Sequence, residues 1–343
     1  MKTQSELIPQ NLTGQIVQLT TEQDCLKYLG ESGLQKMNDS LPGNQKVQDF
    51  LPFYVEYLST NSITINTDVV YYGLPQIITC DTLVFDGGSI TSYVQLVINA
   101  TTTQLVNAST KNNYQILVAG ATGTAGANGA NGGPGINGTK GQSESGSSGQ
   151  AGGAGGTGGN GSGGENGING AATPVSNLNL GTIQLSGSDL FTILAQGGAG
   201  GAGGNGGAGG TGGTGGNGGN SYSTTCSQHH NGGAGGNGGP GGIGGPGGNG
   251  GNGSSSNNPV TITVATQVDK NKLSTTSIPG IGGQLGAGGP GGSGGAPGSG
   301  GSGEKHGHDG TSGSNGTAGS QGGNGTAGSN GSIPVINVTV TNN

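Results

Sequence analysis

The sequence has very little of what builds an ordinary globular core. Among 343 residues there is no tryptophan, aromatic residues make up 3% and charged residues make up 7%. A chain of this length with so few large apolar side chains cannot fill a conventional hydrophobic core. Backbone hydrogen bonds and close backbone packing must therefore hold most of the chain, with a small apolar core elsewhere.

Cysteine and positive charge are also scarce, and each scarcity excludes a class of protein. Cys25, Cys80 and Cys226 are odd in number and widely spaced, which argues against a disulfide framework. The formal net charge of −7 argues against a nucleic-acid partner. No apolar run reaches ~18 residues, and no basic segment followed by an apolar one opens the chain. We therefore expect neither membrane insertion nor an ordinary signal peptide.

Catalytic patterns are missing too. Acidic residues are sparse, and neither a Ser-His-Asp arrangement nor a phosphate-binding loop has a sequence context here. Matches to G-x-G-x-x-G arise trivially in a glycine-rich chain and indicate nothing. We therefore expect no enzymatic activity and no cofactor.

Glycine is what the sequence has in abundance, and it recurs at every third position in six long arms. The arms cover Gly120–Gly141, Gly146–Gly170, Gly197–Gly219, Gly232–Gly253, Gly280–Gly301 and Gly307–Gly331. A period of three is the period of polyproline II, which has three residues per turn and no internal hydrogen bonds. One face of each arm is bare backbone, so another backbone can approach closely and form hydrogen bonds with it.

Collagen and a disordered linker are the alternatives to an ordered bundle of arms. Collagen requires Pro or hydroxyproline between its glycines, but this chain has 13 Pro against 86 Gly and its middle arms read Gly-Gly-X. A flexible linker does not need a fixed glycine register or matched arm lengths. Breaks near 142–145, 221–231 and 302–306 divide the arms into three antiparallel hairpins, each about 70 Å long at ~3.1 Å per residue. We number them hairpins 1 to 3, each with an outgoing arm and a return arm.

In this architecture the chain resembles the polyglycine II proteins. These include the snow-flea type of antifreeze protein and the distal adhesins of some phage long tail fibres. The resemblance covers about half of the chain and rests on the arms, not on any shared motif. It implies a bundle of polyglycine II helices, and it implies either ice binding or receptor binding as the function.

The segments beside the hairpins predict β-strands. Residues 114–119 and 190–195 are apolar runs that end at a hairpin. Residues 174–180, 259–264 and 334–340 each open with Pro-Val and then alternate apolar with polar residues. Shorter alternating segments lie between 63 and 107. We predict a β-solenoid, or a small β-sandwich, with the hairpins inserted at one recurring corner.

The predicted organisation follows from these patterns. We expect a helical N-terminal cap or docking region over 1–60, a β-strand base over 61–119, 171–196, 254–279 and 332–343, and polyglycine II hairpins over 120–170, 197–253 and 280–331 that form one bundle. Within the first region, one helix is predicted over 21–39 with Thr20 and Thr21 as caps, and a second over 47–58.

Side-chain content predicts which arms are central. Hairpin 2 is Gly-Gly-X almost throughout, so only one face of each of its arms carries side chains. The outgoing arm of hairpin 1 and the return arm of hairpin 3 carry side chains on two faces. We therefore predict that hairpin 2 lies in the centre and that those two arms lie at the edges.

The hairpin tips collect the residues with recognisable chemistry. All four histidines of the chain lie there. The candidate receptor-binding residues are Glu144, Tyr222, Cys226, His229, His230, Glu304, Lys305, His306, His308 and Asp309. If the hairpins run side by side, these side chains converge at one end of the bundle, and loops on a rigid scaffold commonly carry function.

Three interpretations of the tips are open. Polar residues and histidine are simply tolerated in turns, or the tips recognise a receptor, or His229, His230, His306 and His308 bind a metal, with Cys226 or Asp309 as a further ligand. Adjacent or alternate histidines are a weak metal signal.

The function expected from these observations is that of a non-enzymatic virion or extracellular adhesin. Its tips would contact a cell-surface receptor, and its N-terminal region would dock onto a larger fibre or virion protein. A homo-oligomer is compatible with this arrangement. A structural filament or coat subunit and an ice-binding protein are the alternatives.

Overall fold

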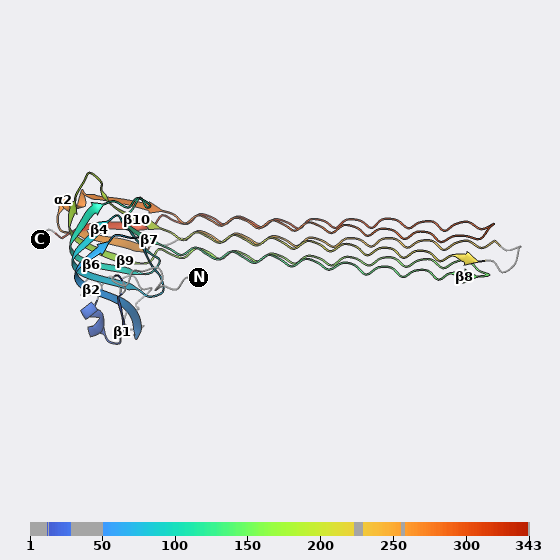
Figure 1. Cartoon of the computed structure of the whole chain (residues 1–343), viewed down its shortest axis with the longest axis horizontal. Coiled ribbons are helices and arrows are strands. Elements are labelled where there is room, and N and C mark those ends of the chain that lie inside the picture. Colours follow the sequence, from blue (N-terminus) through green and yellow to red (C-terminus); the bar gives the residue numbers. More distant parts are fainter. Residues whose placement is uncertain (1–11, 13, 29–50, 223–228, 255–257, 342–343) are drawn as a thin grey trace.

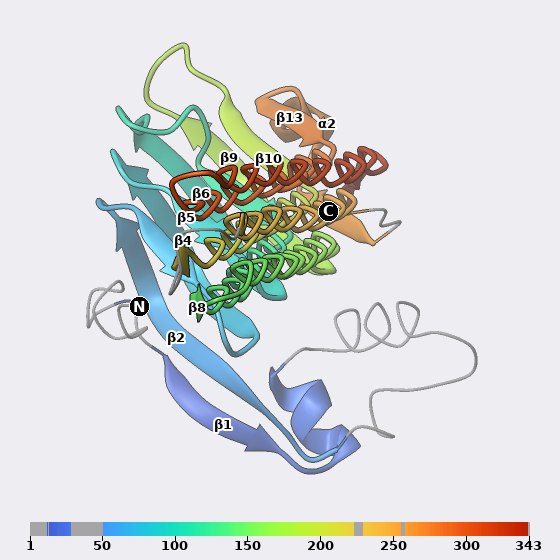
Figure 2. The same ribbon diagram turned by 90° about the vertical axis from the view of Figure 1, so that its right-hand side faces the viewer.

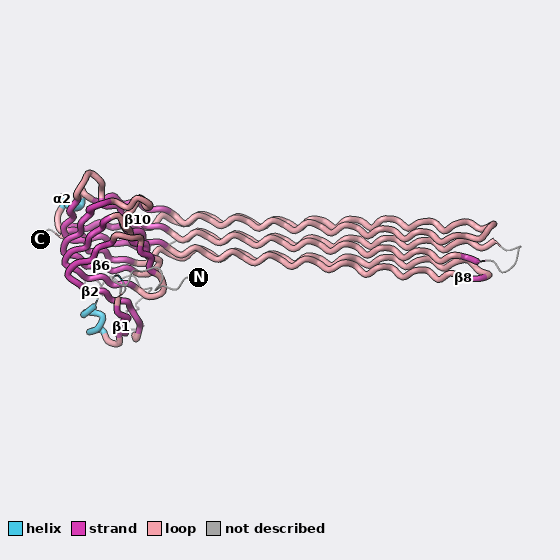
Figure 3. Tube along the Cα trace, viewed as in Figure 1, coloured by secondary structure: helices cyan, strands magenta, loops and turns pink. Residues whose placement is uncertain are grey.

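The chain forms a compact base at one end and a long glycine-rich shaft that projects from it (Figure 1). The computed structural model describes residues 12, 14–28, 51–222, 229–254 and 258–341. Within them the regular secondary structure is mainly β. The base contains the two large sheets, and the shaft consists of the six arms, which run as extended segments outside any strand for nearly all their length (Figure 3).

One sheet of the base has seven strands in the order β1-β2-β4-β6-β9-β12-β14. They span β1 Gln15–Leu19, β2 Phe53–Ile65, β4 Gln76–Asp86, β6 Leu96–Asn107, β9 Ser176–Leu185, β12 Pro259–Val264 and β14 Val335–Val340. β1 runs antiparallel to β2, and all other neighbours are parallel.

The second sheet is parallel throughout, in the order β13-β10-β7-β5-β3. Its strands span β3 Val69–Tyr71, β5 Ile90–Ser92, β7 Ile116–Ala119, β10 Phe191–Gln196 and β13 Leu273–Ile278. The apolar core lies between the two sheets. Phe85 of one sheet meets Phe191 of the other edge to face, with ring centroids 5.1 Å apart. Alternate residues of each strand face this core, which explains why the alternating segments predicted the strands.

The topology places all three hairpins at one corner of the base. Hairpin 1 leaves from β7 and returns into β9, hairpin 2 leaves from β10 and returns into β12, and hairpin 3 leaves from β13 and returns into β14. Because β7, β10 and β13 are neighbours in one sheet, and β9, β12 and β14 are neighbours in the other, the hairpins emerge side by side. The recurring corner predicted from the sequence is therefore present.

Backbone hydrogen bonds join the six arms into two layers of three. Within a layer, parallel arms bond at every third residue, as in Gly123 N to Ala199 O at 2.8 Å and Gly200 N to Ile281 O at 2.9 Å. Between the layers, antiparallel arms bond in the same rhythm, as in Gly236 N to Gly216 O at 2.8 Å. Two of every three residues in the central arms therefore donate to a neighbouring backbone.

Hairpin 2 occupies the centre of the shaft, as its Gly-Gly-X repeats predicted. Each of its arms bonds to four neighbouring arms, whereas the outgoing arm of hairpin 1 and the return arm of hairpin 3 each bond to two. Figure 2 shows hairpin 2 between the other two hairpins. The arms of hairpin 2, with two bare backbone faces, thus have four neighbouring arms each, and the two edge arms, with one bare face, have two.

The close approach of the arms requires glycine. A Cβ atom added at Gly210 would lie 1.9 Å from the carbonyl oxygen of Gly133 on the adjacent arm. A Cβ atom at Gly133 itself would have nothing within 4 Å, because this residue faces outward at the edge. The glycine period therefore marks the backbone faces that touch, whereas Gly133 and Gly323, which lie outside it, are open positions.

The prediction for the N-terminal region is partly wrong. Residues 22–28 are helical, and the Asp24 amide donates to the predicted cap Thr21 Oγ1 at 3.1 Å. The predicted helix over 47–58 is not formed where the structure describes it, because Phe53 begins the long strand β2, and 47–50 lie outside the described residues. The aromatic and β-branched residues here fit a pleated strand paired on both sides better than a helix. The described part of 1–60 is thus strand β1, one short helix and the first half of β2.

This N-terminal layer covers part of the outer face of the seven-stranded sheet, over β2, β4 and β6. Leu19 and Cys25 are fully buried against Val55, Ile77 and Val97, which point away from the main core. Burial also raises the pKa of the Cys25 thiol. The N-terminal residues therefore pack on the sheet face and extend its edge through β1.

Candidate functional site: the hairpin tips

The three hairpin tips meet at the end of the shaft farthest from the base (Figure 1). The tips of hairpins 1 and 2 are joined by a two-stranded parallel ladder, β8 Glu144–Ser145 with β11 Ser221–Tyr222. The tips of hairpins 2 and 3 are joined by contacts of His229 and His230 with hairpin 3. The structure therefore brings the described tip residues of different hairpins together.

Glu144 and Tyr222 lie on the side of hairpins 1 and 2. The Glu144 carboxylate accepts a hydrogen bond from Gln150 Nε2 at 2.8 Å, which holds this side chain against the return arm. Tyr222 is 55% exposed, and its hydroxyl accepts from Asn220 Nδ2 at 3.4 Å. The Tyr222 ring is thus an amphipathic surface presented to solvent, as anchors of binding sites commonly are.

The histidines of hairpin 2 form the junction with hairpin 3. His229 Nδ1 lies 2.9 Å from the carbonyl oxygen of His306, and the two rings meet edge to face at 5.5 Å. The carbonyl oxygen of His230 accepts from Ser221 Oγ at 2.9 Å and from the Glu304 amide at 3.2 Å. These bonds fix the second tip against the third, and they leave ring edges of histidine at the surface.

The third tip is a tight turn with charged side chains around it. The Asp309 carboxylate accepts from the Gly303 amide at 2.9 Å, which closes the turn. The His308 amide donates to Asn231 Oδ1 at 2.9 Å, again across hairpins. Lys305 and His308 are exposed, whereas Glu304 is half-buried, with Oε1 enclosed and without a hydrogen-bond partner among the described residues. Charge of both signs is therefore displayed at this end.

The metal hypothesis gains no support at the tips. Among the described residues, no group of three or more His, Cys, Asp and Glu side chains is arranged to hold a metal ion. Of the four histidines, His229 and His306 make the ring contact, whereas His230 and His308 take part in the junction through their backbone atoms. Cys226 lies outside the described residues.

Asparagine has a structural role in the shaft that the sequence analysis missed. At many positions in the exposed rows of the arms, the outward backbone N–H bonds to no backbone acceptor, and an Asn side chain of a neighbouring arm accepts from it instead. Asn128 Oδ1 accepts from the Asn205 amide at 2.8 Å, and Asn205 Oδ1 accepts from the Ala287 amide at 2.9 Å. The same contact recurs in the other layer, as between Asn166 and the Asn249 amide at 2.7 Å. The available signal was the spacing of Asn along an arm by multiples of three residues, as at Asn205, Asn217 and Asn220.

Comparisons with known proteins assign neither a family nor a function to the shaft or the tips. No protein-family model matches the sequence, and no curated protein matches it. One solved structure is similar, the springtail antifreeze protein from Granisotoma rainieri, described as a nine polyproline type II helical bundle whose crystal waters match the ice lattice. The two are 24% identical over 63% of this chain and 95% of that chain, with a TM-score of 0.08. A TM-score this low supports no conclusion about fold or function.

No helix in the described ranges has the length and apolarity needed to cross a membrane.

Proposed function

We propose that this chain is a non-enzymatic adhesin of a virion or of the extracellular space, which presents its hairpin tips to a cell-surface receptor. The observation that carries the proposal is the gathering of the tips of three separate hairpins at the far end of one shaft. A projection built this way displays exposed Tyr222, the His229–His306 pair and charged Lys305 at a distance from the base. Short loops on a stiff scaffold are a common design for recognition.

The proposal includes the fine structure of the shaft and the base. We interpret the arms as polyglycine II helices, since their hydrogen bonds recur at every third residue and join neighbouring arms. We interpret the base as a β-solenoid, since successive parallel strands alternate between two facing sheets. Both features make the chain stiff, and stiffness reduces the entropy lost when the tips bind.

The proposal assigns attachment to the opposite end of the molecule. The N-terminal layer, with exposed Ile16 and Tyr54, would dock onto a larger fibre or virion protein. A homo-oligomer is a further way to present several sets of tips at once. Neither nucleic acid nor a membrane has a place in this function.

A cell-adsorption assay tests the proposal. The fluorescently labelled full chain is added to a panel of bacterial cells, and bound protein is measured by flow cytometry. Alanine at Tyr222 and His229 should lower binding to a recognised cell at least tenfold. Alanine at Thr211 and Thr214, which are exposed on the shaft of the same hairpin, is the matched control and should leave binding unchanged.

Other outcomes would contradict the proposal. Equal adsorption of the tip variant and the unchanged chain would refute tip recognition. Absence of adsorption to any cell, together with self-assembly into filaments, would favour the structural subunit. Thermal hysteresis in a freezing assay, unaffected by the tip substitutions, would favour ice binding.

A further inference from the structure

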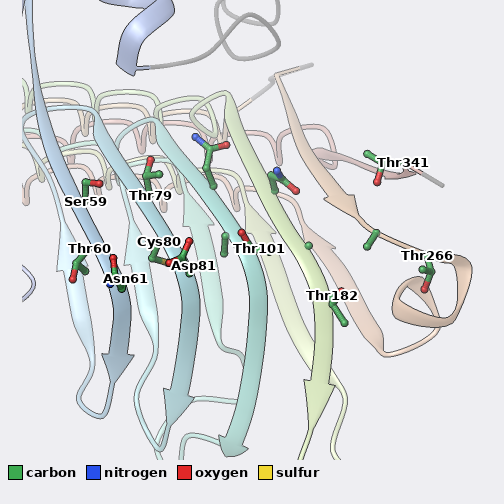
Figure 4. Close-up of a pocket in the computed structure, with 15 residues that line it drawn as sticks. Ser59, Thr60, Asn61, Thr79, Cys80, Asp81, Thr101, Thr182, Thr266 and Thr341 are labelled. Carbon is green, nitrogen blue, oxygen red and sulfur yellow. The ribbon is translucent and has the colours of Figure 1, made fainter. Parts of the chain in front are cut away.

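A groove on the outer face of the seven-stranded sheet is unrelated to the tips. It has a volume of about 860 Å³ and crosses strands β2, β4, β6 and β9, with 265–266 and 341 at one end. Figure 4 shows Ser59 and Thr79 at the same level of adjacent strands, with Asp81 and Thr101 nearby. The volume lies within the range of small-ligand sites.

The floor of the groove is built by strand register. Six polar residues occupy equivalent positions on consecutive strands and form what we call the polar row. Its members are Ser59, Thr79, Asn99, Asn179, Thr263 and Thr339. The first four line the groove, whereas Thr263 and Thr339 continue the row beyond it and their Oγ1 atoms lie 3.1 Å apart in a hydrogen bond. Alternation along the strands directs them away from the core, because their neighbours Ile78, Ile98 and Leu178 are buried in it. With strands ~4.8 Å apart, the row extends about 24 Å across the sheet.

The groove residues of the polar row keep their hydrogen-bonding groups available. The side chains of Ser59, Thr79, Asn99 and Asn179 make no hydrogen bond within the described residues. Polar side chains elsewhere on the same strands do pair across the sheet, as Gln104 Nε2 does with Gln184 Oε1 at 2.9 Å. Unlike Gln104 and Gln184, the groove residues therefore present free donors and acceptors to solvent.

The lining selects a class of ligand. Hydroxyl and carboxamide groups both donate and accept hydrogen bonds, which suits a ligand that does both. Asp81 is the one acidic residue of the lining, which contains no Lys, Arg or His, so the lining offers an anion no positive partner and a metal ion too few ligands. A peptide strand needs a free sheet edge, but β4, β6 and β9 are paired on both sides.

From this chemistry we propose that the groove binds a neutral oligosaccharide, laid across the strands along the polar row. Sugar hydroxyls would bond to Asn99 and Asn179 in the middle of the groove. Ala265, at one end of the groove, would contact the apolar face of a sugar ring. This site is separate from the proposed receptor contacts at the tips and does not depend on them.

The test uses the full chain and named probes. Binding of maltohexaose, cellohexaose, mannohexaose and chitohexaose is measured by saturation-transfer NMR and by titration calorimetry, with an oligogalacturonate as the anionic comparison. At least one neutral probe should bind, and the double change Asn99→Ala with Asn179→Ala should weaken it at least tenfold. Gln104→Ala with Gln184→Ala, on the same two strands outside the groove, is the control and should not alter it.

A second variant guards against a folding defect. Thr79→Val removes one hydroxyl of the row at nearly constant shape, and it should weaken the same probe several-fold with an unchanged melting curve. No binding of any neutral probe at millimolar concentration would overturn the proposal. So would a preference for the anionic probe, or binding that survives the Asn variants and is lost with Tyr222→Ala and His229→Ala at the tips.

Discussion

Replacing Gly210 with alanine is expected to loosen the shaft, whereas the same change at Gly133 is not. The two residues lie at one level of the bundle, on adjacent arms. The Cβ of Gly210→Ala would lie 1.9 Å from the Gly133 carbonyl oxygen, and real Cβ atoms do not approach such an atom within 3.0 Å. The two arms would therefore have to separate by about 1.1 Å, the difference between these distances.

The magnitude follows from the bonds that this separation strains. Between these two arms, the Gly132 amide donates to Ala208 O at 2.8 Å, and the Gly135 amide donates to Thr211 O at 2.7 Å. Leaving a buried backbone group unpaired costs about 1–3 kcal/mol. Two such bonds give a loss of about 2–6 kcal/mol for Gly210→Ala. Gly133→Ala meets open space and should instead stabilise by about 0.4–1 kcal/mol, because alanine restricts the unfolded chain.

Thermal and denaturant unfolding, followed by far-ultraviolet circular dichroism, measure the difference. The melting temperature of Gly210→Ala should fall clearly, and that of Gly133→Ala should equal or exceed that of the unchanged chain. Hydrogen exchange at the Gly132 and Gly135 amides should accelerate only in Gly210→Ala. Equal stability of the two variants would refute the claim that the glycine period marks touching backbones.

Three further predictions concern side chains. Asn205→Ala should destabilise the shaft by about 0.5–1.5 kcal/mol, because the Ala287 amide loses its acceptor, and Asn205→Asp should recover most of that loss in the same melting experiment. Burial raises the pKa of Asp269, but bonds from Thr266, Ile183 and Lys272 outweigh it and leave that pKa below its ordinary value. The ionised Asp269 carboxylate therefore stabilises the fold above about pH 4, and this stabilisation is lost as the pH falls through the lowered pKa. Asp269→Asn should lower the free energy of unfolding at pH 7, and it should make that free energy depend less on pH in the acid range. Hydrogen bonds from Thr20 and Thr21 lower the pKa of Asp24 to about 2, so its carboxyl carbon should still report the ionised form at pH 3 in an NMR titration.

The arms were predictable because their structure is a local pattern. Glycine at every third residue indicates one bare backbone face, and arms with two glycines per turn have more neighbouring arms than arms with one. This is why the central position of hairpin 2 followed from Gly-Gly-X alone. The strands beside the hairpins followed in the same way, since alternation along β12 and β14 records one buried face.

The N-terminal region was harder because its pattern is ambiguous. Phe53, Tyr54 and Tyr57 recur at intervals that fit a helix face as well as a strand. This segment forms strand β2 because it pairs with β1 on one side and with β4 on the other. Such long-range pairing cannot be predicted from the local sequence.

The contacts at the tips and in the groove could not be predicted from the sequence either, because they join residues far apart in the chain. The concentration of histidines at the breaks was visible in the sequence, but the contact of His229 with His306 joins residues 77 apart in the chain. The polar row joins residues such as Thr79, Asn99 and Asn179, whose alignment depends on the register of three strands. Neither contact has a local signature.

A spin-label distance along one arm tests the ordered shaft most directly. Labels are placed at Ala121→Cys and Lys140→Cys, both exposed on the outgoing arm of hairpin 1, in a chain with Cys226 replaced by serine. The buried Cys25 and Cys80 are checked for labelling in the parent chain. Nineteen residues at ~3.1 Å each predict a narrow distribution near about 59 Å. A broad distribution near about 24 Å, as expected for a flexible glycine-rich coil of that length, would contradict the account.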